Sequence, residues 1–244
     1  MQTEKVIQHI VNWLKDYSNQ SKTDGFVIGI SGGIDSAVTS YLCALTDKKV
    51  ICINMPIHQR NDEYARGREH IQDLKKRFPN VSETEVNLSE TFETLRKSLP
   101  ENTANDWLSM ANTRSRLRMT TLYAIAQSNK LLVAGTGNKV EDFGVGFFTK
   151  YGDGGVDLSP IAGLYKTQVY ALAKSLNVIS SIQYAKPTDG LWEDGRSDED
   201  QIGATYPELE WVMEYLKSSF GFGVSGFGLG ETEIDVLNEI SARE

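Results

Sequence analysis

Two hydroxyls, two glycines and one carboxylate stand together just after an apolar run near the N-terminus. Residues 26–37 read FVIGISGGIDSA. Successive backbone N–H groups in a glycine-rich turn form a nest that binds anions, and the positive end of a following helix strengthens it. The serine hydroxyls can add further donors. The segment predicts a phosphate-binding loop made of Gly29, Ile30, Ser31, Gly32, Gly33, Ile34, Asp35 and Ser36.

Asp35 sets this loop apart from the GxxxxGK[ST] phosphate loop, which carries a lysine. A carboxylate beside a polyphosphate is repelled unless a cation lies between them, and Mg²⁺ commonly binds one or two carboxylates together with phosphate oxygens. Asp35 therefore predicts a magnesium ion. The alternative is a plain strand-to-helix turn, in which Asp35 is only an acid in the first turn of a helix.

Strands alternating with helices must position this loop. Apolar runs predict strands at 26–30, 49–56 and 131–136, and residues 84–88 are a candidate for one more strand, the third in chain order. Helices are expected at 6–17, 36–45, 61–78, 104–129, 207–219 and 231–243. The alternation predicts an α/β fold with a doubly wound, mainly parallel β-sheet and helices on both faces, in a single domain over residues 1–244.

A second candidate segment, GTGNK at 135–139, also follows a predicted strand. Ligands of doubly wound sheets bind at the carboxyl ends of the strands, so we expect this segment and the loop at 29–36 to share one site. The glycine-rich stretch at 144–157 and the irregular stretch at 185–206 are typical of functional loops.

Composition narrows the class of protein. The formal net charge of −8, without a basic run, disfavours a nucleic-acid partner, because phosphate neutralisation supplies most of the affinity for long nucleic acids. No apolar run approaches the ~20 residues that cross a bilayer, and the acidic, amphipathic N-terminus is unlike a signal peptide. Cys43 and Cys52 have no metal-ligand spacing. We expect a cytoplasmic protein with reduced cysteines and no membrane or nucleic-acid partner.

SGGIDS resembles the pyrophosphate loop of the ATP pyrophosphatases, which share the adenine nucleotide alpha-hydrolase-like fold and adenylate a substrate. That group includes NAD, GMP and asparagine synthetases and tRNA-modifying enzymes, and the loop alone does not choose among them. Further segments are similar to ammonia-dependent NAD synthetases, in the same order, over roughly residues 5 to 240. They are NTRSRLRM (112–119), GTGNKVE (135–141), FTKYGDG (148–154), LSPI (158–161), KPTDGLW (186–192) and SDED (197–200).

The resemblance implies a ligase that forms a C–N bond. The nicotinate carboxylate of deamido-NAD attacks the α-phosphate of ATP, pyrophosphate leaves, and ammonia then displaces AMP to give NAD. The implied partners are ATP, deamido-NAD, ammonia and a second copy of the chain in a homodimer. Ammonia is expected as the direct nitrogen source, since glutamine use needs a glutaminase domain with a catalytic cysteine.

The resemblance also assigns residues. Those that match family positions are Asp35 and Glu141 for magnesium; Thr136, Lys166 and Thr188, besides the loop at 29–36, for ATP; Arg116, Lys150 and Asp157 for deamido-NAD; and Asp153 as the base that takes a proton from ammonium, with Lys166 also counted as catalytic. A base is chemically required, because ammonium is not a nucleophile.

Each assignment has a plainer alternative. Glu141 is otherwise a solvated loop acid, Lys166 an exposed helix lysine, and Asp153 the acid of an Asp-Gly turn. Ser197 with Asp200 is otherwise a helix cap. Arg114 and Arg118 share one helix face and Arg116 points nearly opposite, so only one of these two faces can line the site.

The sequence departs from the family pattern at its end and contains one misleading glycine motif, and two other functions remain to be weighed. Family members often carry a basic C-terminal segment with a His-Lys pair, and this sequence ends at Arg243-Glu244 without one. GFGVSG at 221–226 fits GxGxxG by letter, but no predicted strand precedes it.

Two other functions are alternatives to an NAD synthetase. A tRNA-thiolating enzyme would need a basic face and a reactive cysteine. A non-catalytic ATP-binding module would not need Asp153, Glu141 and the glycine loop together.

The predicted homodimer rests on two apolar stripes. The first helix displays Val6, Ile10, Trp13, Leu14 and Tyr17, and the long helix after Ala104 adds Trp107, Met110 and Leu117. Either stripe alone is explained by packing on the sheet of the same chain. Together they exceed what one sheet face needs, so we expect an isologous interface built on the long helix.

Overall fold

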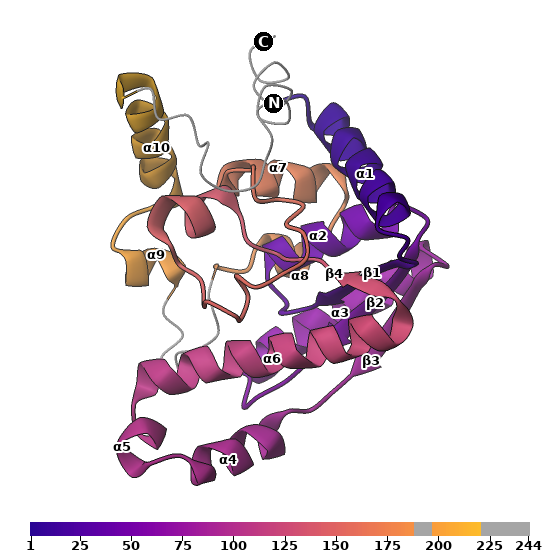
Figure 1. Cartoon of the computed structure of the whole chain (residues 1–244). Helices are drawn as coiled ribbons and strands as arrows, with labels where there is room; N and C mark the ends of the chain where they lie inside the picture. The colour runs from indigo at the N-terminus through magenta and orange to yellow at the C-terminus, as the bar shows by residue number, and fades with distance from the viewer. Residues whose placement is uncertain (188–196, 221–244) are drawn as a thin grey trace.

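The computed structural model of the chain describes residues 1–187 and 197–220. Four strands form a parallel sheet in the order β3-β2-β1-β4 (Figure 1). In register, Phe26 lies opposite Val50 on one side and Leu132 on the other. The strands are β1 (Gly25–Gly29), β2 (Lys49–Asn54), β3 (Val81–Glu85) and β4 (Leu131–Val133).

The strand order creates a crevice at the carboxyl end of the sheet. From β1 the chain passes to β2 and β3 on one side, whereas β4 lies on the other side of β1. The connections that leave β1 and β4 therefore diverge, and the space between two such connections is where doubly wound sheets bind ligands. This confirms the predicted α/β fold and places the loop at 29–36 at that crevice.

Helices cover both faces of the sheet. The first face carries α1 (Thr3–Gln20), α2 (Ile34–Ala44), α3 (Asn61–Arg77), α7 (Lys166–Ser175) and α8 (Ser180–Gln183). The second carries α4 (Ser89–Ser98) and the long α6 (Trp107–Asn129), joined by α5 (Glu101–Ala104). Beside the crevice lie a π-helix, η1 (Lys139–Val145), and α9 (Asp198–Ile202) and α10 (Tyr206–Phe220). Figure 1 shows α6 running across the sheet, with α4 and α5 below it.

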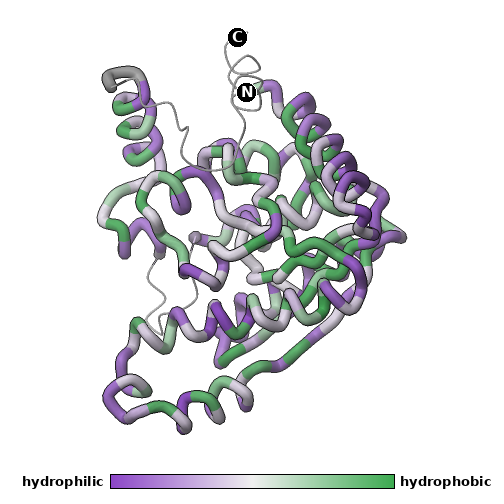
Figure 2. Tube along the Cα trace, viewed as in Figure 1, coloured by the Kyte–Doolittle hydropathy of each residue, from purple (hydrophilic) through white to green (hydrophobic). Residues whose placement is uncertain are grey.

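The core forms two layers because alternate residues of each strand point to opposite faces. Phe26 and Ile28 are buried with α1, α2 and α7, whereas Val27 is buried with α4 and α6. Parallel strands covered on both faces read as continuous apolar runs, which is why FVIGI and VICI signal strands so clearly. Figure 2 shows hydrophobic residues running through these central strands.

The stripe on α1 packs within the chain. Val6, Ile10 and Leu14 are buried in the first core layer, and only Tyr17 of the stripe is well exposed, at 38%. On the long helix α6, Met110 of the predicted stripe is buried and Leu117 packs against the second core layer, whereas Trp107 and the neighbouring Leu108 and Tyr123 are exposed. An argument for a homodimer therefore depends on α6.

The third strand begins earlier than the sequence predicted. We expected residues 84–88, but β3 spans Val81–Glu85, with Val81 paired to Val50. The apolar Val86 and Leu88 that suggested the later strand pack in the second core layer instead. An edge strand with one apolar residue carries little hydrophobic pattern, so pairing with β2 decided its position.

The later helix predictions are confirmed where the structure describes the residues, and one lies outside them. The helices expected at 61–78 and 207–219 correspond to α3 and α10, and the one expected at 231–243 lies beyond residue 220. Helices α4, α5, α7 and α8 and the π-helix were not predicted, and α9 lies within the stretch at 185–206 that we expected to be irregular. Among the helices of residues 1–187 and 197–220, none is both long and apolar enough to cross a bilayer.

Candidate active site

The loop at 29–36 wraps around the N-terminus of α2. Gly33 is the N-cap of this helix, and its N–H donates to Ser31 Oγ at 3.1 Å. Ser36 Oγ donates to Gly33 O at 3.0 Å and lies 3.1 Å from Ser31 Oγ. The two hydroxyls therefore already sit at a helix N-terminus, the setting that favours an anion.

Gly32 is required by the conformation of this loop. Its φ is +85°, which side-chain-bearing residues rarely adopt, and an added Cβ would lie 2.5 Å from Glu63 O on α3. The loop therefore lies against the first turn of α3. Gln59, which precedes α3, donates from its side chain to Ser31 O at 3.1 Å and fixes the other edge of the loop.

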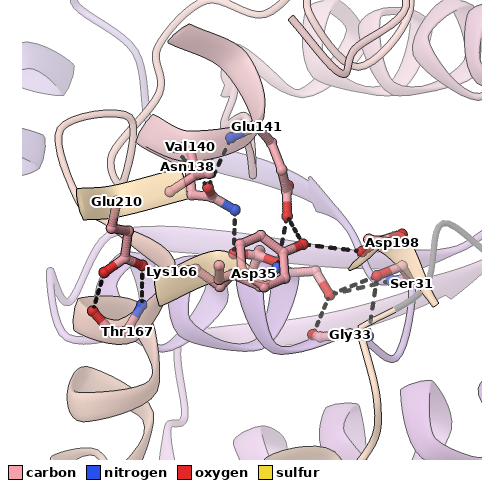
Figure 3. Close-up of polar contacts among 12 residues, drawn as sticks. Ser31, Gly33, Asp35, Asn138, Val140, Glu141, Lys166, Thr167, Asp198 and Glu210 are labelled. Atoms are coloured by element: carbon pink, nitrogen blue, oxygen red, sulfur yellow. Dashed lines mark hydrogen bonds and ion pairs between the residues drawn. The ribbon is translucent and has the colours of Figure 1, made fainter. Parts of the chain in front are cut away.

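Lys166 joins the two predicted magnesium ligands. Its Nζ lies 2.6 Å from Asp35 Oδ2 and 2.8 Å from Glu141 Oε1 (Figure 3). The three residues come from α7, α2 and η1, and Lys166 is only 2% exposed. The structure thus excludes the exposed helix lysine and the solvated loop acid that the sequence left open.

Asn138 links the Asp35 carboxylate to the backbone of Glu141, and sequence reasoning missed it. Its Nδ2 donates to Asp35 Oδ1 at 3.2 Å, and its Oδ1 accepts from the N–H groups of Val140 and Glu141, both at 3.1 Å. It is fully buried as the N-cap of η1. Asparagine after a strand in GTGNK is a helix-cap signal that could have revealed it.

Tyr206 was also missed. Its hydroxyl donates to Glu141 Oε1 at 2.7 Å and lies 3.3 Å from Asp198 Oδ2, while the Lys166 ammonium sits 4.9 Å from the centre of its ring. Helix α10 holds it there, because Glu210 accepts from Thr167 N at 2.9 Å and Thr167 Oγ1 at 2.6 Å (Figure 3). Nothing local in the sequence marks this contact.

The cluster of Asp35, Glu141 and Lys166 has an electrostatic imbalance. Burial alone would lower the pKa of Lys166, but the carboxylates of Asp35 and Glu141 outweigh it and raise that pKa, so the ammonium is charged. Burial raises the pKa of Asp35, and the ammonium offsets only part of this effect. Two carboxylates face one ammonium in a buried place, and a partly buried excess of negative charge is costly.

These residues fit a magnesium ion. The donors are hard carboxylate oxygens, which Mg²⁺ prefers, and there are two of them, the number it commonly takes from protein when phosphate oxygens complete its shell. The uncompensated negative charge calls for a further cation. Within the described residues no group of three or more metal-binding side chains gathers, so a bound ion needs oxygens from phosphate or water as well.

A cavity of about 550 Å³ opens beside this cluster. Asp35, Thr136 and Glu141 lie on its wall, as do Gly29, Ile30, Ser31 and Ser36 of the loop. Apolar side chains complete it, notably Met55, Met119, Leu122 and Val156. A cavity with one polar, phosphate-binding end and an apolar remainder suits a nucleotide.

Asp153 lies on the wall of the same cavity, in the turn that follows η1. Its Oδ1 accepts from Ser115 Oγ at 2.6 Å and from Thr149 N at 3.1 Å. Nearby Asp142 also lines the cavity, and burial, with the charges of Asp153 and Glu141, raises the pKa of Asp142 to about 7.

The three residues predicted to contact deamido-NAD lie outside this cavity. Arg116, Lys150 and Asp157 are exposed, and Arg116 Nε donates to Lys150 O at 3.0 Å. Asp157 accepts from Tyr123 of α6 at 3.1 Å. They lie together along the outer side of α6 and its neighbouring loop.

Arg118 is the arginine of α6 that faces the cavity. It lines the wall, its Nε donates to Met55 O at 3.1 Å, and burial, with the charge of Arg114, lowers its pKa to about 10. The guanidinium therefore remains charged at neutral pH and is a candidate contact for phosphate. This settles which face of the three arginines points inward.

Two remaining predictions concern the segment before α9. Thr188 lies outside the described residues. Ser197 is the N-cap of α9 and forms a capping box with Asp200, so the helix-cap alternative is correct.

Comparison with known proteins identifies the relatives of this chain. The family model described as NAD synthase matches residues 6–221. The NH(3)-dependent NAD(+) synthetase of Mesoplasma florum is 37% identical over 212 residues, which cover 86% of this chain and 84% of that protein.

Two solved structures are similar to this chain over almost all of its length. The NMN synthetase from Francisella tularensis superposes with a TM-score of 0.81 at 31% identity, covering 99% of this chain and 95% of that one. The NH3-dependent NAD synthetase from Campylobacter jejuni gives 0.73 at 26% identity, covering 98% and 93%.

Proposed function

Because this chain belongs to the NAD synthase family, we propose that the cavity beside Lys166 is where it carries out the amidation of its nicotinate substrate. The family reaction is the ATP-dependent conversion of deamido-NAD and ammonia to NAD, the last step of NAD biosynthesis, and its enzymes are ligases. ATP is a co-substrate. Membership excludes the two rival functions considered above, a tRNA-thiolating enzyme and an ATP-binding module.

One observation carries the proposal. The glycine loop after β1 and the acid Glu141 after β4 meet across the crevice, joined by Lys166, and the cavity beside them reaches Asp153. A phosphate site, a cation site and a carboxylate base at one cavity are what adenylation followed by aminolysis requires.

In the first step we assign ATP to the cavity, with its phosphates on the loop at 29–36 and on Thr136. A carboxylate oxygen of the nicotinate attacks the α-phosphorus, the bond from that phosphorus to the bridging oxygen of pyrophosphate breaks, and an acyl adenylate forms. Lys166 and Arg118 offset negative charge that builds up on the phosphates. Asp35 and Glu141 would hold magnesium, which neutralises phosphate charge when bound.

In the second step Asp153 takes a proton from ammonium. The neutral ammonia attacks the carbonyl carbon of the adenylate, the bond to the AMP oxygen breaks, and AMP leaves with that electron pair, while the nitrogen that has added gives up its extra proton to water to leave the amide. The hydrogen bonds that Asp153 accepts from Ser115 and Thr149 hold the carboxylate at the cavity wall. General-base catalysis of this kind contributes about 10²–10⁴-fold.

The assay that tests the function uses the purified chain with ATP, Mg²⁺, ammonium and deamido-NAD. We expect pyrophosphate, AMP and NAD in equal amounts, and no NAD when glutamine replaces rigorously removed ammonium. Pyrophosphate release without any amide product would show that the adenylate is transferred to an acceptor other than ammonia. The absence of both pyrophosphate release and NAD formation would reject the proposed function.

The likeness to an NMN synthetase favours a second candidate substrate. Of the two structures compared above, that one has the higher identity and TM-score. Nicotinate mononucleotide presents the same carboxylate and lacks the adenylate half. Competition between the two substrates at equal concentration, measured as the ratio of kcat/KM, decides between them, and we expect deamido-NAD to be preferred.

We propose that the chain acts as a homodimer formed through α6. The predicted deamido-NAD contacts Arg116, Lys150 and Asp157 lie outside the cavity, beside the exposed Tyr123 of this helix. A partner helix placed there would enclose these residues and complete a dinucleotide site. The buried, free cysteines Cys43 and Cys52 support a cytoplasmic location.

Light scattering tests the dimer. We expect a mass of about twice 27.2 kDa. Ala124→Arg puts a long charge on the exposed side of α6 and should yield a folded chain of 27.2 kDa with poor activity, because charge in an interface core is costly. Ala65→Arg, the same change on exposed α3, should remain dimeric. A fully active wild-type monomer would contradict the proposal.

A further inference from the structure

Ser115 of α6 makes a reciprocal pair of hydrogen bonds with Asp153. Its Oγ donates to Asp153 Oδ1 at 2.6 Å and accepts from Asp153 N at 3.0 Å. The two residues are 38 positions apart and both line the cavity. A single hydroxyl therefore holds both the side chain and the backbone of the proposed base.

The backbone of the turn is built around this serine. A Cβ added to Gly152 would lie 2.3 Å from Ser115 Oγ, so only glycine lets the turn approach so closely. Within the turn, Gly152 N and Gly154 N both donate to Thr149 O, at 2.9 and 3.2 Å. The turn is thus folded on itself and anchored to the rigid α6 through Ser115.

The same contacts distinguish the two oxygens of the carboxylate. Ser115 Oγ and Thr149 N both donate to Asp153 Oδ1. Within the described part of the chain, no hydrogen bond is donated to Oδ2. The pair therefore leaves one defined oxygen able to accept a proton.

We propose that Ser115 is a positioning residue that aims Oδ2 of Asp153 at the ammonium ion. The inference rests on the proposed function, in which Asp153 acts only after the adenylate has formed. Ser115 consequently matters for the attack of ammonia and not for the release of pyrophosphate. This separation of the two half-reactions is what a merely structural serine would not produce.

The test compares Ser115→Ala with the wild type in both half-reactions. Pyrophosphate release is followed in a single turnover without ammonium, and amide formation is followed against ammonium concentration. We expect unchanged pyrophosphate release and a loss of about 10- to 100-fold in amide formation, the range that removing a hydrogen bond to a charged group implies. Ser128→Ala is the matched control, because that hydroxyl bonds only within α6, where it donates to Ile125 O and accepts from Asn129 Nδ2.

Hydroxylamine provides an independent readout. It is largely unprotonated at neutral pH, so its attack on the adenylate needs no proton removal beforehand. We expect Ser115→Ala and Asp153→Asn to form the hydroxamate at the wild-type rate while both lose activity with ammonium, the aspartate variant more severely.

Three outcomes decide the matter. Equal damage to pyrophosphate release and amide formation in Ser115→Ala would make Ser115 structural and overturn the inference. Full activity of Ser115→Ala with ammonium would also overturn the inference. Failure of the wild type to release pyrophosphate with any nicotinate substrate would instead reject the proposed function, which keeps the two failures distinguishable.

Discussion

Lys166→Met is expected to lower the free energy of unfolding by about 3–5 kcal/mol and to abolish pyrophosphate release. Methionine has a similar volume, but it leaves the carboxylates of Asp35 and Glu141 facing each other without the ammonium that lies 2.6 and 2.8 Å from them. Removing one partner of a buried ion pair costs about that much, because the remaining charges stay buried and uncompensated. Denaturant unfolding at neutral pH measures the first effect.

The controls separate this charge effect from the loss of a lysine as such. Lys174→Met changes an exposed lysine in the last turn of the same helix and should stay within about 0.5 kcal/mol of wild type. Adding Asp35→Asn to Lys166→Met should recover part of the lost stability, since it removes one of the repelling charges, whereas Asp35→Asn alone should cost stability. In this double-mutant cycle Asp35→Asn should destabilise the wild type and stabilise Lys166→Met. If it destabilised both, the three charges would not be coupled.

Asp35→Asn and Glu141→Gln are expected to reduce pyrophosphate release by about 10²–10³-fold with the fold intact. Each substitution preserves size but removes a charge from the predicted cation site. A metal ion contributes several kcal/mol of charge stabilisation to such a step, and each 1.4 kcal/mol is tenfold in rate. The half-saturating Mg²⁺ concentration should rise as well. Circular dichroism checks the fold and a coupled pyrophosphate assay checks the rate.

Exposed acids provide the comparison for these two variants. Asp16→Asn on α1 and Glu90→Gln on α4 make the same chemical changes away from the cavity and should leave the rate and the Mg²⁺ requirement unchanged. Normal pyrophosphate release from Asp35→Asn or Glu141→Gln would remove that residue from the cation site. A shared loss in all four would point to net charge as the cause.

Local signals determined the sheet and one half of the site. Strands buried on both faces need continuous apolar runs, so FVIGI and LLV could be recognised without neighbours. The loop at 29–36 could also be predicted from its own residues. A turn at positive φ needs glycine, and an anion site at a helix N-terminus needs hydroxyls close by in the sequence. The strand alternation then implied that the segments after β1 and β4 meet at one edge.

Contacts between distant segments could not be predicted. Asn138 reaches Asp35 across 103 positions, and Tyr206 reaches Glu141 across 65. Asn138 carries a local helix-cap signal, but nothing near either residue in the sequence indicates its distant partner. The position of β3 was misjudged for the same reason, since a short edge strand takes its register from its partner rather than from its own alternation.

Residue types and their order along the chain therefore determined the fold class and the glycine loop, and the family resemblance indicated the acids and the lysine that we propose to act beside it. Tertiary structure alone decided that Lys166 is buried between Asp35 and Glu141, that Arg118 rather than Arg116 faces the cavity, and that Ser115 holds Asp153. The physical reason is that backbone propensities and hydrophobic patterns act over a few residues, whereas burial, pKa and hydrogen-bond partners depend on which segments the folded chain brings together.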